Sequence, residues 1–182
     1  MRPHFATLKQ DKAALGGFVP AGYIPDAALY GVVHASHVLR SDTPLGRAVS
    51  EAQRAGLRFE KKVHEKLREA AAQHHGSYLP GPWFSYQLGN STGGICQPDG
   101  ILEIDGHSTI VEVKLTHVDR AWLQLRRLYQ PVVQSAMRRS CSILEIAKQG
   151  DPHLAFPEKV NLIRKLSDVD PSAYNLIFAS DL

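Results

Sequence analysis

The sequence predicts an α/β domain in which a mixed central sheet is flanked by helices. Three observations lead to this prediction. Residues 44–75 carry apolar side chains at helical spacing, residues 108–115 alternate between apolar and polar side chains as a strand does, and residues 119–139 return to helical spacing. The expected order of the core elements is one helix, three strands, one helix and one strand.

The length and composition fit one compact domain with additions at both ends. The chain has 182 residues, of which 43% are hydrophobic and 21% are charged, and these values are typical of globular proteins. Glycine and proline interrupt the first part, so we expect residues 1–45 to form an irregular N-terminal arm packed on the core. Residues 46–182 are expected to form the domain and a C-terminal extension, with apolar segments at 160–166 and 174–178 as strands or edge elements.

Composition also bears on location and partners. No apolar run approaches the roughly 20 residues that span a bilayer, and the first residues lack the pattern of a signal peptide. We therefore expect a cytoplasmic protein with no membrane partner. Cys96 and Cys141 are far apart in the sequence, which predicts free thiols. The net charge of +3 permits a polyanionic partner without requiring one.

Basic residues gather on the two predicted helices. They are Arg54, Arg58, Lys61, Lys62, Lys66 and Arg68 on the first, and Arg120, Arg126, Arg127, Arg138 and Arg139 on the second. Each group is a candidate for one bank of a phosphate-binding channel. The alternative is that both are solvated helix faces balanced by neighbouring acids.

The first helix is defined by apolar side chains at helical spacing. They are Val49, Ala52, Leu57, Phe59, Val63, Leu67 and Ala70. Gly56 is expected to bend or divide this helix, and Gly76 to mark its end.

Three strands are expected to follow. Residues 78–88 contain a Pro-Gly-Pro sequence and then an aromatic run, which predicts a strand entered through a turn. Residues 95–104 are expected to form one strand that bends at Gly100, and Asp105-Gly106 is a hairpin signal. Residues 108–115 then form the third strand, because β-branched and polar side chains alternate there.

A second helix is expected from residue 119 to residue 139, with Pro131 kinking it. Its apolar positions are Trp122, Leu125, Leu128, Val132, Val133 and Ala136. Residues 142–147 are expected to form the fourth strand of the core.

The third strand and the one before it carry a candidate catalytic centre. Glu112 and Lys114 are two residues apart on a strand, so their side chains leave the same face, and the hairpin folds Asp99 back beside them. Two buried carboxylates are costly unless partners or a metal ion neutralise them. Mg²⁺ or Mn²⁺ fits this donor set, with the backbone carbonyl of Val113 as a further ligand.

The pair Pro98-Asp99 followed by Glu112-Val113-Lys114 resembles the signature of the PD-(D/E)xK nuclease superfamily, and the resemblance covers residues 46–147. It implies a restriction-endonuclease-like core with the helix and strand order given above. It also implies an additional acidic residue on the first helix, a place that suits Glu60. Glu60 would bind the metal directly or through water.

The resemblance further implies function. The expected activity is metal-dependent hydrolysis of phosphodiester bonds in DNA, with Lys114 either orienting the attacking water or stabilising the transition state. The glutamine and arginine residues of the second helix favour a phage-type or recombination exonuclease. A homo-oligomer or a recombination partner protein is compatible with this expectation.

Some related exonucleases place a glutamine and a tyrosine on the second helix, usually four residues apart. Gln124 and Tyr129 suit these roles but are five apart, which on a regular helix separates the two side chains by roughly 140°. Gln124 is still a candidate to contact the metal-bound water, and Tyr129 is expected to be a core aromatic residue. The candidates for contact with nucleic acid are Lys61, Arg126, Arg127 and Gln130.

Other interpretations stay open. The chain would then be a catalytically silent nuclease-fold module that binds DNA or protein, or an ordinary α/β domain that acts through protein contacts. Glu112 and Lys114 would in the simplest case be solvated residues of an exposed hairpin. His64 lies four residues after Glu60 and would share its helix face, either near the site or as a partly buried histidine.

Overall fold

The computed structural model describes residues 24–39, 50–117, 119–149 and 174–179, which form two sheets and a set of helices. The strands are β1 (Val32–Val38), β2 (Ser77–Pro80), β3 (Trp83–Leu88), β4 (Gly93–Cys96), β5 (Gly100–Ile104), β6 (His107–Thr116), β7 (Cys141–Gln149) and β8 (Tyr174–Phe178). The helical segments are α2 (Ala27–Tyr30), α3 (Glu51–Gln73), α4 (Asp119–Gln124), η1 (Leu125–Tyr129) and α5 (Gln130–Met137).

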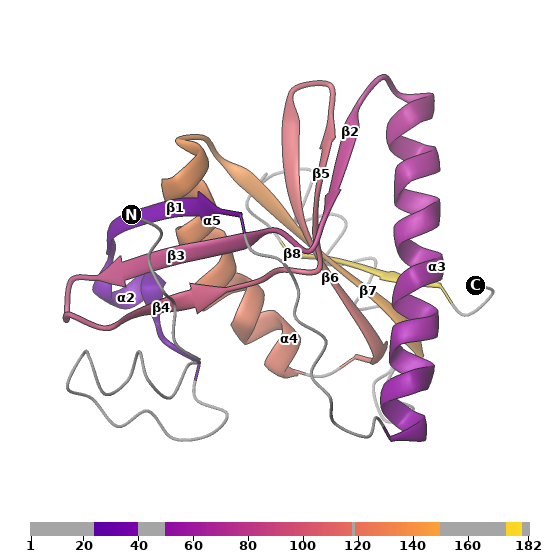
Figure 1. Cartoon of the computed structure of the whole chain (residues 1–182), viewed down its shortest axis with the longest axis horizontal. Coiled ribbons are helices and arrows are strands. Elements are labelled where there is room, and N and C mark those ends of the chain that lie inside the picture. Colours follow the sequence, from indigo (N-terminus) through magenta and orange to yellow (C-terminus); the bar gives the residue numbers. More distant parts are fainter. Residues whose placement is uncertain (1–23, 40–49, 118, 150–173, 180–182) are drawn as a thin grey trace.

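The larger sheet has five strands in the order β2-β5-β6-β7-β8. Strands β2, β5 and β6 are antiparallel neighbours, whereas β6, β7 and β8 run parallel. Figure 1 shows α3 on one side of this sheet and α4 and α5 on the other. The prediction of an α/β fold with a mixed sheet flanked by helices is therefore confirmed. None of the described helices is long and apolar enough to cross a membrane.

Helix α3 is uninterrupted, and side-chain hydrogen bonds cap its first turn. The Ser50 side chain accepts a hydrogen bond from the backbone of Gln53, whose side chain in turn accepts from the Ser50 backbone, so the first turn is capped at both groups. Gly56 lies inside the helix and does not divide it, contrary to one expectation. Residues 44–49 of the predicted helix lie outside the described residues.

Two apolar cores cover the two faces of the five-stranded sheet. Toward α3, the core joins Phe59 and Val63 of the helix to strands β6 and β7. Toward α5 and the three-stranded sheet β1-β3-β4, a second core joins Leu125 and Val132 to Ile110 of β6. Alternation along β6 decides which side chain enters which core.

The sequence prediction of a single strand over residues 95–104 is wrong. The chain forms β4 and β5 instead, and these belong to different sheets. Residues 78–88 likewise form the unexpected strand β2 before β3. Two hydrogen bonds join the β2-β3 connection to the β4-β5 connection, where the chain passes between the two sheets. Gly81 N–H donates to the Asp99 carbonyl at 2.9 Å, and Gln97 Nε2 donates to the Gly81 carbonyl at 2.9 Å. The β3-β4 hairpin is thus an insertion that returns to the large sheet at Asp99.

The second predicted helix contains a wide turn. Leu125–Tyr129 is π-helical, and the Gln130 N–H donates to the Leu125 carbonyl five residues earlier. The irregularity that the sequence predicts at Pro131 takes this form immediately before the proline, which has no N–H with which to continue the regular ladder. In such a turn, residues five apart lie on one face.

The remaining elements extend the predicted core. Strand β7 contains the predicted strand 142–147 and is longer, and β8 coincides with the segment predicted at 174–178. The predicted element at 160–166 lies outside the described residues. Within the predicted arm 1–45, residues 24–39 form α2 and β1, and β1 pairs with β3.

Candidate active site

The structure brings Asp99, Glu112 and Lys114 together where β5 begins and β6 runs past it. Gly100 pairs with Val111, so Asp99 faces the stretch of β6 that carries the other two residues. The Asp99 Oδ2 atom accepts a hydrogen bond of 2.7 Å from the Val113 N–H. The Lys114 ammonium contacts Glu112 Oε1. Both side chains of β6 emerge on the face opposite to α3, as alternation predicts.

Glu112 is the most unusual carboxylate of this group because it is only 2% exposed. Its Oε2 atom is buried without a hydrogen-bond partner among the described residues. Burial, together with the nearby charge of Asp99, raises the pKa of Glu112 to about 8. Burial also raises the pKa of Asp99, while the Val113 N–H and the Lys114 charge oppose that shift. The raised pKa values mean that Lys114 alone does not keep both acids ionised at neutral pH, and that a further cation would favour their ionised forms.

Lys114 is the cation of the site. Burial, the largest influence, would on its own lower the pKa of Lys114, but the charge of Glu112, the hydrogen bond to it and the charges of Asp99 and Glu145 together raise the pKa. Lys114 therefore keeps its positive charge at neutral pH.

Glu60 of α3 lies within electrostatic range of Asp99. It is 37% exposed at the side chain, and its charge contributes to the raised pKa of Asp99, although burial contributes more. The Glu60 Oε1 atom is 3.3 Å from Nε2 of His64, and the opposite ring nitrogen, Nδ1, is 3.2 Å from the Tyr78 hydroxyl. His64 is buried, which agrees with the placement as a partly buried histidine, and its hydrogen bonds connect it to Glu60 and Tyr78.

The wide turn η1 brings Gln124 and Tyr129 together. Gln124 Nε2 donates to the Tyr129 hydroxyl, so the expectation that the two side chains diverge by about 140° is wrong, because the helix between them is not regular. Tyr129 is buried, as expected. Burial and the charges of Glu112 and Asp99 raise its pKa, so its hydroxyl lies within electrostatic range of both carboxylates.

The predicted nucleic-acid contacts divide into exposed and buried residues. Lys61 is exposed on α3, and Arg127 is half-exposed with its Nε 3.5 Å from Asp26. Arg126 donates to Gln130 Oε1 at 3.0 Å. Gln130 itself is 5% exposed and donates to the Cys141 carbonyl at 2.8 Å. Its expected contact with nucleic acid is therefore corrected: its amide joins α5 to β7.

Sequence analysis missed Glu145 and His117. Glu145 of β7 is fully buried directly beside Glu112 in the parallel pair, and its Oε2 atom is 2.9 Å from His117 Nδ1. Burial raises the pKa of Glu145, and the imidazole partly opposes the shift. One signal was available in the sequence, because an acid inside an otherwise apolar strand is unusual.

The donor atoms of this site fit a metal ion that is bound by only one or two protein carboxylates. The described residues contain no group of three or more His, Cys, Asp or Glu side chains arranged to hold an ion. Mg²⁺, however, is usually bound through one or two carboxylates, with water and phosphate oxygens completing the shell. The Glu112 Oε2 atom, buried and without a hydrogen-bond partner, is the kind of oxygen that such an ion would satisfy.

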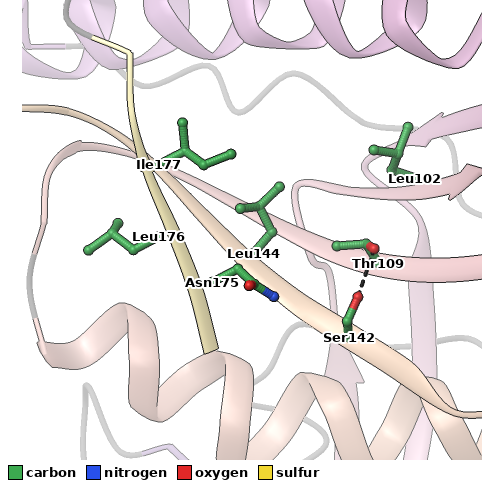
Figure 2. A pocket seen from close by; sticks show the side chains of 7 residues that line it. All are labelled: Leu102, Thr109, Ser142, Leu144, Asn175, Leu176 and Ile177. Atoms are coloured by element: carbon green, nitrogen blue, oxygen red, sulfur yellow. Dashed lines mark hydrogen bonds between the residues drawn. The ribbon is translucent and has the colours of Figure 1, made fainter. Parts of the chain in front are cut away.

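The described cavities lie away from this site. One, of about 290 Å³, lies on the α3-facing side of the large sheet, where Leu102, Leu144 and Ile177 contribute apolar walls. Figure 2 shows it with the Thr109–Ser142 hydrogen bond of 2.8 Å along one wall. No charged residue lines it, so its chemistry is unlike that of the Asp99–Glu112 site.

Comparison of the chain with protein families, with curated proteins and with solved structures found no match. Function is therefore inferred from the residues of the site and their geometry.

Proposed function

We propose that this chain is a metal-dependent nuclease that hydrolyses phosphodiester bonds in DNA. One observation carries the proposal: the buried Glu112 of β6 and the partly buried Asp99 beside the start of β5 lie together, Lys114 contacts Glu112, and Glu112 Oε2 has no hydrogen-bond partner among the described residues. Removing such acids from water is costly for folding. A divalent cation bound by these carboxylates would offset the cost and would in turn bind a phosphate group of the substrate.

Asp99 and Glu112 are the side chains that would hold Mg²⁺ or Mn²⁺, with the Val113 carbonyl as a further ligand and Glu60 acting directly or through water. When bound, the ion would lower the pKa of a water molecule and neutralise charge on the scissile phosphate. Burial of Glu112 favours this role because a desolvated carboxylate attracts a cation more strongly than a solvated one.

Lys114 would provide the positive charge next to the reacting phosphate. Its raised pKa keeps the ammonium protonated, which fits stabilisation of the transition state or orientation of the attacking water better than removal of a proton. Gln124 and Tyr129 present an amide and a hydroxyl on the same side of the sheet, where they would orient water or a phosphate oxygen.

The order of elements around the site supports a restriction-endonuclease-like core. If the inserted β3-β4 hairpin is set aside, α3 is followed by β2, β5 and β6, then by the α4-η1-α5 helix and β7. This is the order that the resemblance to PD-(D/E)xK nucleases implies. The paired Gln124 and Tyr129 favour the phage or recombination exonuclease type within that superfamily.

The test is a cleavage assay with Mn²⁺ on linear, nicked and single-stranded DNA. We expect cleavage by the full chain, loss of cleavage in Lys114→Ala and in Asp99→Asn, and loss on removal of the metal with a chelator. Cleavage by Lys114→Ala at the wild-type rate would come from a contaminant or another site and would contradict the proposal, as would the absence of cleavage on all three substrates.

A second candidate is a catalytically silent module that binds DNA or protein. The contact of Lys114 with Glu112 favours it, because the ammonium occupies one oxygen that an ion would otherwise use. Titration with Mn²⁺ separates the two candidates. A silent module would show salt-sensitive DNA binding without affinity for Mn²⁺.

A further inference from the structure

A chain of hydrogen bonds joins helix α3 to Asp99 through two residues that the proposed reaction does not use. His64 Nε2 lies 3.3 Å from Glu60 Oε1, and His64 Nδ1 lies 3.2 Å from the Tyr78 hydroxyl. The same hydroxyl lies 3.4 Å from the backbone carbonyl of Asp99. Four residues from α3, β2 and the start of β5 are thus connected through polar atoms.

The direction of these bonds follows from the chemistry of the groups. An ionised carboxylate only accepts hydrogen bonds, so His64 Nε2 donates to Glu60. The Tyr78 hydroxyl has one proton, so with a neutral imidazole that proton is shared between two acceptors, His64 Nδ1 and the Asp99 carbonyl, in a three-centre hydrogen bond. Burial, followed by the charge of Asp99, raises the pKa of Tyr78, so the hydroxyl keeps that proton at neutral pH.

Packing fixes the middle of this chain. His64 is 9% exposed, and its ring meets the ring of Tyr78 edge-on at 5.6 Å between centroids. Tyr78 in turn lies over Gly100: a Cβ atom at that position would be 2.2 Å from the hydroxyl oxygen. The absence of a side chain at residue 100, directly after Asp99, therefore gives the Tyr78 hydroxyl its place.

Electrostatics explain why such a support is needed. The charge of Glu60 raises the pKa of Asp99, which means that the two carboxylates repel one another. Glu60 is partly exposed, so without a donor its side chain would turn toward water. The imidazole of His64 is the donor that holds it.

We propose that His64 and Tyr78 are positioning residues that hold Glu60 and Asp99 as two arms of one divalent-cation site. The inference rests on the proposed function, because it concerns the same ion. His64 fixes the orientation of the Glu60 carboxylate, and Tyr78 ties that histidine to the backbone of Asp99. Partners of this kind around ligating carboxylates typically contribute about 10- to 100-fold to metal affinity.

The experiment is a calorimetric titration of the full chain with Mn²⁺ at neutral pH, without nucleic acid. Tyr78→Phe removes the hydroxyl and keeps the ring, and His64→Leu removes both ring nitrogens. We expect each to weaken Mn²⁺ binding by about 10-fold or more. The double variant is expected to lose no more than about the larger single loss, because both residues act through one chain of bonds.

Two further variants distinguish positioning from packing. His64→Gln retains an N–H group within reach of Glu60, so it is expected to recover part of the affinity that His64→Leu loses. Tyr86→Phe removes the hydroxyl of a buried tyrosine in the three-stranded sheet and is expected to leave Mn²⁺ affinity unchanged. Thermal unfolding of each variant establishes that it is folded, and if His64→Leu does not fold, Tyr78→Phe decides the outcome.

The possible failures are distinct. If Asp99→Asn abolishes Mn²⁺ binding while folded Tyr78→Phe and His64→Leu bind as the wild type does, the positioning role is overturned and the nuclease proposal stands. Equal losses in Tyr78→Phe and Tyr86→Phe would also overturn it, because the effect would then come from any buried hydroxyl. If the wild-type chain binds no Mn²⁺, both proposals fail.

Discussion

The two faces of the five-stranded sheet differ in the side chains that β6 presents to the helices packed on them. Toward α3, β6 presents Val111 and Val113, which pack with apolar residues of the helix and of β7. Toward α4 and α5, the same strand presents Glu112 and Lys114. Both faces are largely buried, yet β6 presents charged side chains on only one of them. The apolar face accounts for stability, and the charged face has a cost that stability does not explain.

The largest expected effect separates the two faces by activity. Lys114→Ala should lower the rate of DNA cleavage by about 100- to 1,000-fold, the range typical for loss of a group that stabilises a transition state. Ile146→Ala, on the α3-facing side, should leave the cleavage rate of the folded protein unchanged and lower the free energy of unfolding by about 2–5 kcal/mol. Single-turnover assays and urea denaturation measure the two quantities. If Lys114→Ala and Ile146→Ala lose the same amount of activity, the proposed difference between the two faces is contradicted.

The next effect concerns pH. The pKa of Glu112 is about 8 in the folded chain and 4.5 ordinarily, so the folded protein retains a proton that the unfolded chain releases between these values. Without metal, stability should therefore fall as pH rises from 4.5 to 8. Glu112→Gln removes this loss and should stabilise the chain more at pH 8.5 than at pH 5, by over about 1.4 kcal/mol, the equivalent of one pKa unit. Urea denaturation in the presence of a chelator, at both pH values, measures the unfolding free energies of the variant and the wild type. If their difference does not depend on pH, the raised pKa of Glu112 is contradicted.

A smaller effect, on the free energy of unfolding, is expected at Gly100, where β5 begins beside Asp99. Gly100→Ala places a methyl group within 2.6 Å of the Tyr78 ring and hydroxyl, so the ring must move. We expect a loss of about 1–3 kcal/mol in unfolding free energy, as for other overpacked positions. Gly56→Ala is the matched control, because its added methyl group meets its nearest neighbour at 3.9 Å. If both substitutions have the same effect, Gly100 does not give Tyr78 its place.

The smallest effect is expected in the wide turn. Deleting Arg127 would convert η1 to a regular helical turn while keeping Gln124 and the tyrosine on one face, because a four-residue step replaces a five-residue step. The loss of its ion pair with Asp26, whose two side chains are partly solvent-exposed and whose closest atoms are 3.5 Å apart, should cost about 1 kcal/mol or less. Deleting Lys62 from α3 is the contrasting case, since it rotates the rest of a regular helix by about 100°. A crystal structure and thermal unfolding of each variant would test both expectations.

Part of the fold and part of the site were predictable from local patterns. The spacing of apolar residues gave α3, and alternation along β6 gave the shared face of Glu112 and Lys114. These features depend on residues within a few positions of one another, and backbone periodicity alone determines them.

Other features depend on partners distant in the sequence. Residues 95–104 divide between two sheets because their pairing strands differ, and Glu145 joins the site because β7 aligns in parallel beside β6. Packing against the sheet likewise buries Gln130 and accommodates the wide turn that pairs Gln124 with Tyr129. The sequence by itself determined which residues share a face within a regular strand or helix. Only the tertiary structure decided which faces meet, because strand partners and helix irregularities are selected by contacts between distant segments.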